Sequence, residues 1–150
     1  TMERNFDFYE TRTVHESSLS PCVHAILANR IGRSEKAYEM YLRTSRLDLD
    51  DYNHEVDEGL HITSMGGTWM SVVYGFGGMK IRDGLLSFDP VLPGNWDALS
   101  FKILYRGSTL YIKIRKDGMR VENLNGHDID LFLLGNKSRV ASGATVLADL

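Results

Sequence analysis

The fold interpretation depends on the segment Leu60–Met79, whose sequence is LHITSMGGTWMSVVYGFGGM. Gly66 and Gly67 stand directly before an apolar run, and this run predicts a helix over about Thr68–Phe76. Because the run is apolar on nearly every side, we expect the helix to be buried against other helices, with Trp69 in the core.

The glycine pair in front of this helix has two interpretations. Glycine lets a backbone approach a ligand, and a helix N-terminus offers unpaired N–H groups and the positive end of its dipole, so the pair predicts an anion site. Ser64 and Thr68 could add hydroxyl donors, and His61 a titratable one. The alternative is a glycine-rich turn into a buried helix. No nucleotide-binding glycine motif is present, so these residues alone leave both interpretations open.

Length and composition limit the classes of protein to consider. The chain has 150 residues, 43% of them hydrophobic, which suits one ordinary domain or part of a larger protein. A net charge of −3 argues against a nucleic-acid partner. The single cysteine, Cys22, excludes an internal disulfide framework and indicates a reducing, cytoplasmic compartment. No apolar run reaches about 18 residues, so no membrane span is expected.

The first part of the chain predicts helices. Residues 1–16 show no helical period and are expected to form an extended segment anchored by aromatic side chains. Ser20 is the expected N-cap of a helix with Pro21 at its first position, and Gly32 is its expected end. A second helix begins after Ser34, which gives an antiparallel pair with a short connection.

No metal site is predicted. The acidic segment Asp48–Gly59 fails the pattern of a calcium loop, because Val56 stands where glycine is required and Ile62 where glutamate is required. His54 and His61 have no partners at zinc spacing. A solvated loop is the preferred interpretation.

After Asp83-Gly84 the apolar period changes to two, which is typical of half-buried strands. The expected strands are Phe101–Tyr105, Leu110–Arg115, Met119–Val121, Ile129–Leu134 and Ala144–Leu147, with turns at Arg106–Ser108 and Asp117-Gly118. The sequence therefore predicts an α+β protein with a helical part at residues 1–82 and an antiparallel β-sheet domain at residues 83–150. Three helices with such apolar surfaces cannot cover one another, so we expect them to be the last helices of a larger array.

Several motifs in a fixed order resemble the disaccharide phosphorylases of glycoside hydrolase family 65, over roughly residues 6–125. They are His15–Ser20 (HESSLS), Leu47–Asp50 (LDLD), Gly59–Trp69 (GLHITSMGGTW), Gly75–Met79 (GFGGM), Leu86–Pro90 (LSFDP) and Leu92–Trp96 (LPGNW). Within that family, Tyr52-Asn53 and His61–Ser64 are most similar to members that cleave maltose. Members that cleave kojibiose, trehalose or nigerose stay open as relatives.

The resemblance implies a fold and a reaction. The fold is an (α/α)6 toroid followed by a small antiparallel β-sheet domain, and this chain would hold the terminal helices of the toroid. The reaction is inverting phosphorolysis of an α-glucoside, in which a carboxylic acid protonates the leaving oxygen and inorganic phosphate attacks from the opposite face. The resemblance implies phosphate as a co-substrate and no metal or other cofactor. It places the general-acid glutamate upstream of this chain, so no catalytic residue is expected here and Glu16 is not assigned that role.

What the resemblance assigns to this chain is the phosphate site. The matching positions are His15, Ser17, Ser18, His61, Ser64, Gly66 and Gly67. Hydroxyl and backbone N–H groups are expected to donate hydrogen bonds to phosphate oxygens. A histidine is expected to supply a positive charge or a further hydrogen-bond donor. With the family resemblance, the anion-site interpretation of the glycine pair becomes the preferred one.

The resemblance also implies partners: the remainder of the parent enzyme, a disaccharide and phosphate, and a second copy in a homodimer. Two other functions remain as alternatives. One is a hydrolase of the same family, which would use water in place of phosphate. The other is a non-catalytic interaction module whose apolar surface packs on a partner.

Overall fold

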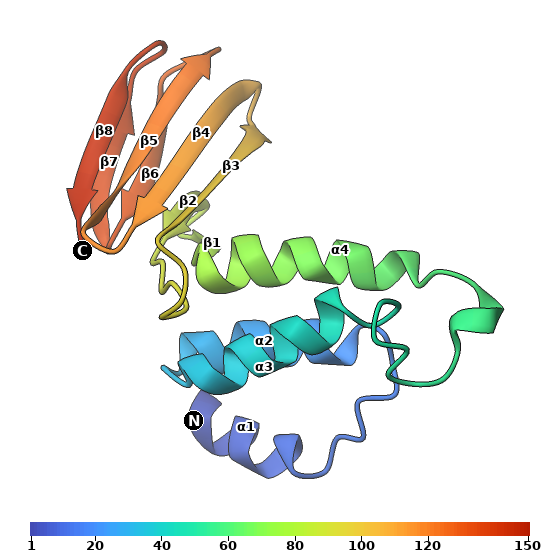
Figure 1. The fold of residues 1–150 in the computed structure, drawn as a ribbon. Helices are drawn as coiled ribbons and strands as arrows, with labels where there is room; N and C mark the ends of the chain where they lie inside the picture. Colours follow the sequence, from blue (N-terminus) through green and yellow to red (C-terminus); the bar gives the residue numbers. More distant parts are fainter. The chain divides into compact units, whose positions relative to one another are not determined.

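The computed structural model describes residues 1–150 and has the predicted α+β architecture (Figure 1). The chain divides into two compact units, Thr1–Phe76 and Gly77–Leu150, which are described separately below. The sequence places the boundary between its helical and β parts slightly later, after Arg82. None of the helices has both the length and the apolar character that crossing a membrane requires.

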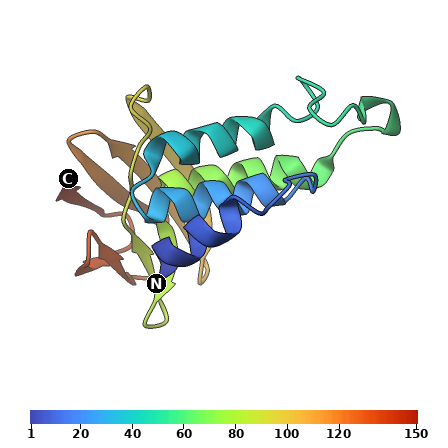
Figure 2. The same ribbon diagram turned by 90° about the horizontal axis from the view of Figure 1, so that it is seen from below.

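The first unit is helical. Its helices are α1 (Met2–Glu10), α2 (Ser20–Arg30), α3 (Ser34–Ser45), a single 3-10 turn η1 (Val56–Glu58), α4 (Ile62–Met70) and the π-helical segment η2 (Ser71–Phe76), which continues α4. Helix α2 is the central element, because it packs against α1, α3, α4 and η2 (Figures 1 and 2).

The predicted pair of helices, α2 and α3, is confirmed, and the acidic segment between α3 and α4 contains only turns and η1. Gly32 follows the end of α2 with a φ of +77°, a value that glycine adopts without steric cost. The predicted cap is wrong by one residue. Leu19 is the N-cap and Ser20 is the first helical residue, because the Ser20 hydroxyl hydrogen-bonds to His15 Nδ1 (2.9 Å) instead of to the helix backbone.

The expectation of an extended N-terminal segment is wrong, since residues Met2–Glu10 form α1. Phe6 is the buried residue of this helix, and Met2, Phe6 and Tyr9 line one pocket together with residues of α2. Their spacing of four and three residues is that of one helix face. The aromatic residues therefore mark a short amphipathic helix.

The predicted start of the third helix is also wrong. Helix α4 begins at Ile62, so Gly66 and Gly67 lie inside the helix and not before it. The reason lies in its buried face, where small residues recur at helical spacing: Ser64, Gly67, Ser71 and Gly75. A Cβ atom built on Gly67 would lie 3.0 Å from Cys22 Cβ and Sγ, so the missing side chain lets α4 approach α2 closely. Close packing offsets the usual cost of glycine in a helix, about 1 kcal/mol each.

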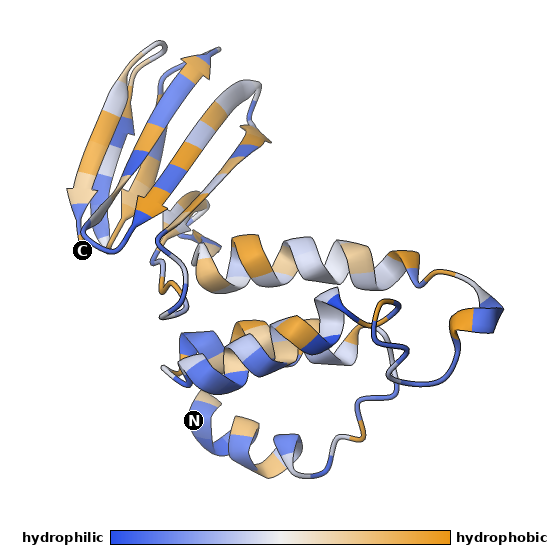
Figure 3. Cartoon of the chain, viewed as in Figure 1, coloured by the Kyte–Doolittle hydropathy of each residue, from blue (hydrophilic) through white to orange (hydrophobic).

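Because small residues face inward, the large apolar side chains of α4 face outward. Ile62, Met65 and Trp69 are exposed, so Trp69 does not belong to the core of this helical unit as expected, since 47% of its surface is exposed. Trp69 makes an edge-to-face contact with Tyr74. Figure 3 shows the apolar colouring along this helix.

The second unit consists of two four-stranded sheets. The strands are β1 (Met79–Arg82), β2 (Leu85–Phe88), β3 (Ala98–Tyr105), β4 (Ser108–Arg115), β5 (Gly118–Asn125), β6 (Ile129–Leu133), β7 (Asn136–Val140) and β8 (Thr145–Asp149). The strand orders are β1-β2-β6-β7 and β3-β4-β5-β8. Fully buried side chains such as Leu110 and Ile112 from one sheet, and Phe88 and Leu131 from the other, form the core.

The strands and hairpin turns predicted after residue 100 are confirmed, but the sheet is not purely antiparallel. Strand β2 pairs with β6 in parallel, and β1, β2 and β7 were not expected. The sequences of β2 and β7 lack the alternation of half-buried strands: three of the four residues of β2 are buried, and four of the five residues of β7 are polar or charged. Strand β1 (MKIR) does alternate, but over only four residues.

The two adjacent glycines of α4 give a matched pair of variants. Gly67→Ala should destabilise the full-length protein by about 1–3 kcal/mol, because the new methyl group would overpack against Cys22. Gly66→Ala should stabilise it by roughly 0.5–1 kcal/mol, because its Cβ would meet no atom within 4 Å and alanine favours a helix. Unfolding by denaturant without phosphate measures both effects. Equal effects of the two variants would contradict the packing role of Gly67.

Candidate functional site

The structure brings together the two segments that were predicted to bind phosphate. Ser18, in the connection that precedes α2, lies beside Thr63 in the first turn of α4, and their hydroxyl oxygens are 2.8 Å apart. Thr63 is exposed and Ser18 is half-buried, so this contact lies at an open surface of the helical unit. Residues 45 positions apart in the sequence thus place two hydroxyl groups at the start of one helix.

The neighbouring predicted residues support this contact in different ways. Ser17 is exposed, and its hydroxyl accepts a hydrogen bond from the backbone N–H of Leu19 (3.4 Å). Ser64 is almost fully buried and donates its hydroxyl hydrogen to the carbonyl oxygen of His61 (2.7 Å). Gly66 is exposed, whereas Gly67 is buried against α2. The side chains of Ser17 and Ser64 therefore stabilise the local backbone.

His61 is the N-cap residue of α4, and Asp48 holds it there. The Asp48 carboxylate accepts a hydrogen bond from the backbone N–H of His61 (3.0 Å) and pairs with its Nδ1 (2.6 Å). Nε2 lies 3.4 Å from a carboxylate oxygen of Glu55. The hydrogen bond to Asp48, with further attraction from Glu55, raises the pKa of His61 above its usual value. Both ring nitrogens of His61 therefore face carboxylates.

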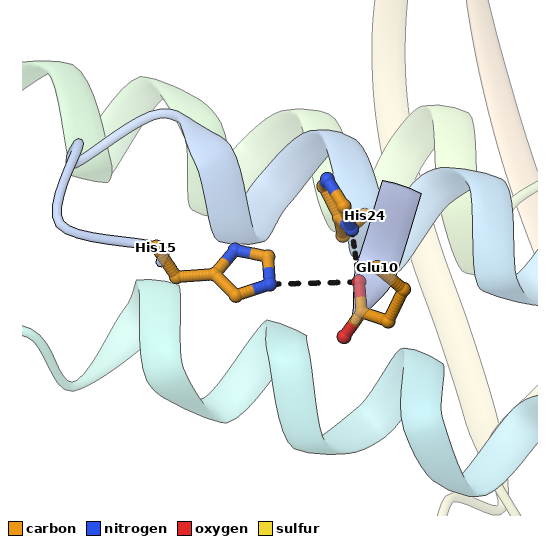
Figure 4. Close-up of side chains that lie close together, drawn as sticks. All are labelled: Glu10, His15 and His24. Atoms are coloured by element: carbon orange, nitrogen blue, oxygen red, sulfur yellow. Dashed lines mark hydrogen bonds and ion pairs between the residues drawn. The ribbon is translucent and has the colours of Figure 1, made fainter. Parts of the chain in front are cut away.

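The ring of His15 belongs to a different cluster. His15 adopts a positive φ of 60°, and its ring is buried, with Nδ1 beside Ser20 and Nε2 pointing toward Glu10 of α1. His24 of α2 hydrogen-bonds to the same oxygen of Glu10, as Figure 4 shows. The structure therefore turns the ring of His15 toward Glu10 and His24 and not toward Thr63.

The surroundings of Ser18 and Thr63 combine the start of a helix with two hydroxyl groups. In the first turn of α4, the N–H groups of Ile62 and Ser64 already donate to the carbonyl oxygens of Leu60 (3.0 Å) and His61 (2.9 Å). What this turn offers an anion is therefore mainly the positive end of the helix dipole. The Ser18 and Thr63 hydroxyl groups hydrogen-bond to each other (2.8 Å), so one of their two hydrogens is left to donate at this point. A charge-assisted hydrogen bond from it would contribute about 1.5–3 kcal/mol.

The sequence interpretation missed Thr63 as a member of this group. It placed the helix start at Thr68, which assigned the free N–H groups to the wrong residues. No local signal marked the true start, because the N-cap is His61, which is not a preferred capping residue, and Asp48 reaches its backbone N–H only in the folded chain. Glu10 and His24 were also missed, because they are close only in the folded chain.

Comparisons with known proteins match both units to one family. Residues 1–70 match the central catalytic domain of glycosyl hydrolase family 65, and residues 79–140 match the C-terminal domain of the same family. A solved structure of a candidate kojibiose phosphorylase from the human microbiome superposes on 99% of this chain and 22% of its own chain, with a TM-score of 0.91 and 36% sequence identity.

Curated relatives carry the names of several disaccharide phosphorylases. The chain is 51% identical to a maltose phosphorylase of Bacillus subtilis over 87% of its length. It is 43% identical to an α,α-trehalose phosphorylase of Thermoanaerobacter brockii over 95% of its length, and 43% identical to a kojibiose phosphorylase of Halothermothrix orenii over 82%. It spans only 18%, 18% and 16%, respectively, of those relatives.

The matches to two successive domains of one family agree with the fold, in which helices precede two β-sheets. The chain belongs to glycosyl hydrolase family 65, and comprises the C-terminal part of such a protein: the end of its central catalytic domain followed by its C-terminal domain.

Proposed function

We propose that this chain is the phosphate-binding, C-terminal part of an inverting disaccharide phosphorylase that converts maltose and phosphate into β-glucose 1-phosphate and glucose. The names of the relatives support phosphorolysis over hydrolysis, and the identity of 51% to a maltose phosphorylase favours maltose as the substrate. Trehalose and kojibiose are the alternative substrates, because relatives named as phosphorylases of those sugars are each 43% identical to this chain.

The observation that carries this proposal is the contact of Ser18 with Thr63. It joins the predicted serine segment to the first turn of α4 at a half-exposed surface, where an anion has access. In the proposed site, Ser17, Ser18, Thr63 and Gly66 lie nearest the phosphate. The side chains of His15, His61 and Ser64, and the close packing that Gly67 allows, position the two segments.

This division of roles follows from where the hydrogen-bonding atoms are engaged. His61 faces Asp48 and Glu55, so a phosphate near its ring would meet two carboxylates. We therefore assign His61 to fixing the start of α4 through its backbone, which keeps the Thr63 hydroxyl in place. Gly67 serves the same end, because its packing on Cys22 sets the position of the whole helix.

The chemistry that these groups would perform is orientation of a nucleophile. In an inverting reaction the attacking group approaches the anomeric carbon from the face opposite the leaving oxygen. Hydroxyl and N–H donors that bind the non-attacking oxygens of phosphate would hold the remaining oxygen in line, and such positioning lowers the entropic part of the barrier. The acid that protonates the leaving oxygen is assigned to the preceding part of the full-length protein.

We also propose partners and a compartment for the full-length protein. The exposed apolar side chains of the helical unit, such as Met65, Trp69 and Val23, are assigned to packing against the preceding helices of a toroid. A homodimer and a cytoplasmic location are proposed from the family resemblance, and the free, buried thiol of Cys22 suits a reducing compartment.

The role of Ser18 can be tested by kinetics. In the full-length protein, Ser18→Ala should raise the Michaelis constant for phosphate about tenfold or more, because a charge-assisted hydrogen bond is lost, while the constant for the disaccharide changes much less. Ser100→Ala, at an exposed position on β3, is the matched control and should change neither constant. An unchanged phosphate dependence in Ser18→Ala would remove this residue from the site.

The type of reaction can be tested with the whole protein and with this chain. The full-length protein should release β-glucose 1-phosphate from maltose only when phosphate is present, whereas residues 1–150 alone should release none, because the general acid is missing. Equal turnover with and without phosphate would indicate a hydrolase. Activity of residues 1–150 alone would contradict the placement of the acid.

The pair of His61 and Asp48 predicts a pH-dependent stability. The pKa of His61 is raised from 6.5 and that of Asp48 is lowered from 3.8, so the pair is fully stabilising between these two values. Its contribution is lost as the pH rises through the raised pKa of His61. Asp48→Asn should therefore lower the thermal midpoint more at about pH 5.5 than at about pH 9.

Asp50→Asn is the control for this experiment. Asp50 pairs with Arg46 (2.6 Å), whose charge does not titrate in this range, so the effect of Asp50→Asn should be the same at both pH values. A pH-independent effect of Asp48→Asn would show that the His61 charge contributes nothing to the start of α4.

A further inference from the structure

A cluster of metal-ligating side chains lies in the helical unit, apart from the contact of Ser18 with Thr63. Glu10 of α1, His15 of the following connection and His24 of α2 each direct one ligand atom into the same space, and these atoms all lie within 4.8 Å of one another (Figure 4). The side chains of Glu10 and His24 are each only 14% exposed, and that of His15 is 7% exposed. The cluster is therefore largely removed from water.

The decisive atom is Nε2 of His15, which is buried and has no hydrogen-bond partner. It lies 3.5 Å from the nearer carboxylate oxygen of Glu10. When Nδ1 of His15 donates its hydrogen to the Ser20 hydroxyl (2.9 Å), Nε2 carries a lone pair, and this lone pair faces the lone pairs of Glu10. A buried acceptor without a partner costs free energy, and a cation between these two acceptors removes that cost.

From this geometry we infer that Glu10, His15 and His24 form a binding site for one zinc ion, with Glu10 Oε2, His15 Nε2 and His24 Nδ1 as ligands. Two imidazole nitrogens and one carboxylate oxygen are a ligand set that zinc takes, whereas magnesium and calcium prefer oxygen ligands alone. The inference does not rest on the proposed phosphorolysis, and no step of that reaction is assigned to the ion.

The surroundings of the cluster fit this role. The Ser20 hydroxyl can accept the Nδ1 hydrogen of His15 and hold the ring in the required orientation, as second-shell partners of zinc ligands commonly do. Lys36 pairs with the other oxygen of Glu10 (2.9 Å) and leaves Oε2 for the ion.

The distances require only a small adjustment. Zinc bonds of about 2.1 Å in a tetrahedral arrangement place ligand atoms roughly 3.4 Å apart, so the ligand atoms would need to shift by no more than about 1 Å. A mostly apolar pocket of about 240 Å³, lined by Met2, Phe6 and Leu27, borders the cluster at His24. A water molecule would complete the coordination of the ion.

An ion at this place would link three parts of the chain: α1, the loop that follows it, and α2. Helix α1 otherwise makes few contacts with α2 and has one buried residue, Phe6. The site would therefore act as a structural clamp for the helix that the sequence analysis did not recognise.

The test is a zinc titration of the full-length protein after treatment with a chelator, followed by calorimetry. One zinc ion should bind per chain and should raise the thermal midpoint. His15→Gln, His24→Gln and Glu10→Gln should each weaken zinc binding by more than the roughly 10–100-fold that loss of a second-shell partner costs. His54→Gln is the matched control, because that histidine side chain is 89% exposed and lies outside the cluster, and binding should be unchanged.

A second measurement avoids variants that fail to fold. Cobalt(II) added to the metal-free wild-type protein should give the visible absorption of a four- or five-coordinate site with nitrogen and oxygen ligands, and zinc should abolish it. Absence of zinc binding and of a cobalt spectrum, or binding that the three variants leave intact, would overturn the inference. The cluster would then be a hydrogen-bonded network of one carboxylate and two histidines.

Discussion

The close approach of α4 to α2 is the constraint on which the helical unit depends. Two helices can pack this closely only where their facing side chains are small, and Gly67 against Cys22 is the tightest such point. The approach determines the rest of the arrangement, because the first turn of α4 then reaches the connection before α2. The contact of Ser18 with Thr63 is the result of that packing.

The same constraint explains the surface of the unit. Small residues on the inner face of α4 leave Met65 and Trp69 on the outer face, where they are exposed. An apolar surface of this kind is what the terminal part of a larger helical domain presents to its neighbours, and residues 1–70 match the central catalytic domain of family 65. Sequence, packing and comparison therefore agree on a chain that is one part of a larger catalytic unit.

The sequence predicted regular elements well where their periodicity was clear. Helices α2 and α3 and strands β3 to β5 have strong patterns and turn residues such as Gly107, and the structure confirms them. Elements without such a pattern were missed. Strand β2 is nearly all buried, and α1 is too short for its period to stand out among aromatic residues.

The candidate site was predicted in part, for a physical reason. The resemblance identified the two segments, but which atoms face a ligand depends on the residue at which α4 begins. Tertiary packing places Gly66 and Gly67 inside this helix, although glycine disfavours helix interiors. Hence Thr63 was missed and Gly67 was assigned to ligand contact. The partners of His15 could not be predicted at all, since Glu10 and His24 approach it only through the packing of α1 on α2.

The most direct test of the central claim is a crystal structure of the full-length protein with phosphate bound. The account predicts a phosphate ion at the first turn of α4, with one oxygen accepting a hydrogen bond from Ser18 Oγ and another from the Thr63 hydroxyl or a first-turn N–H group. A phosphate ion bound elsewhere in the catalytic domain, with the contact of Ser18 and Thr63 unchanged, would contradict it.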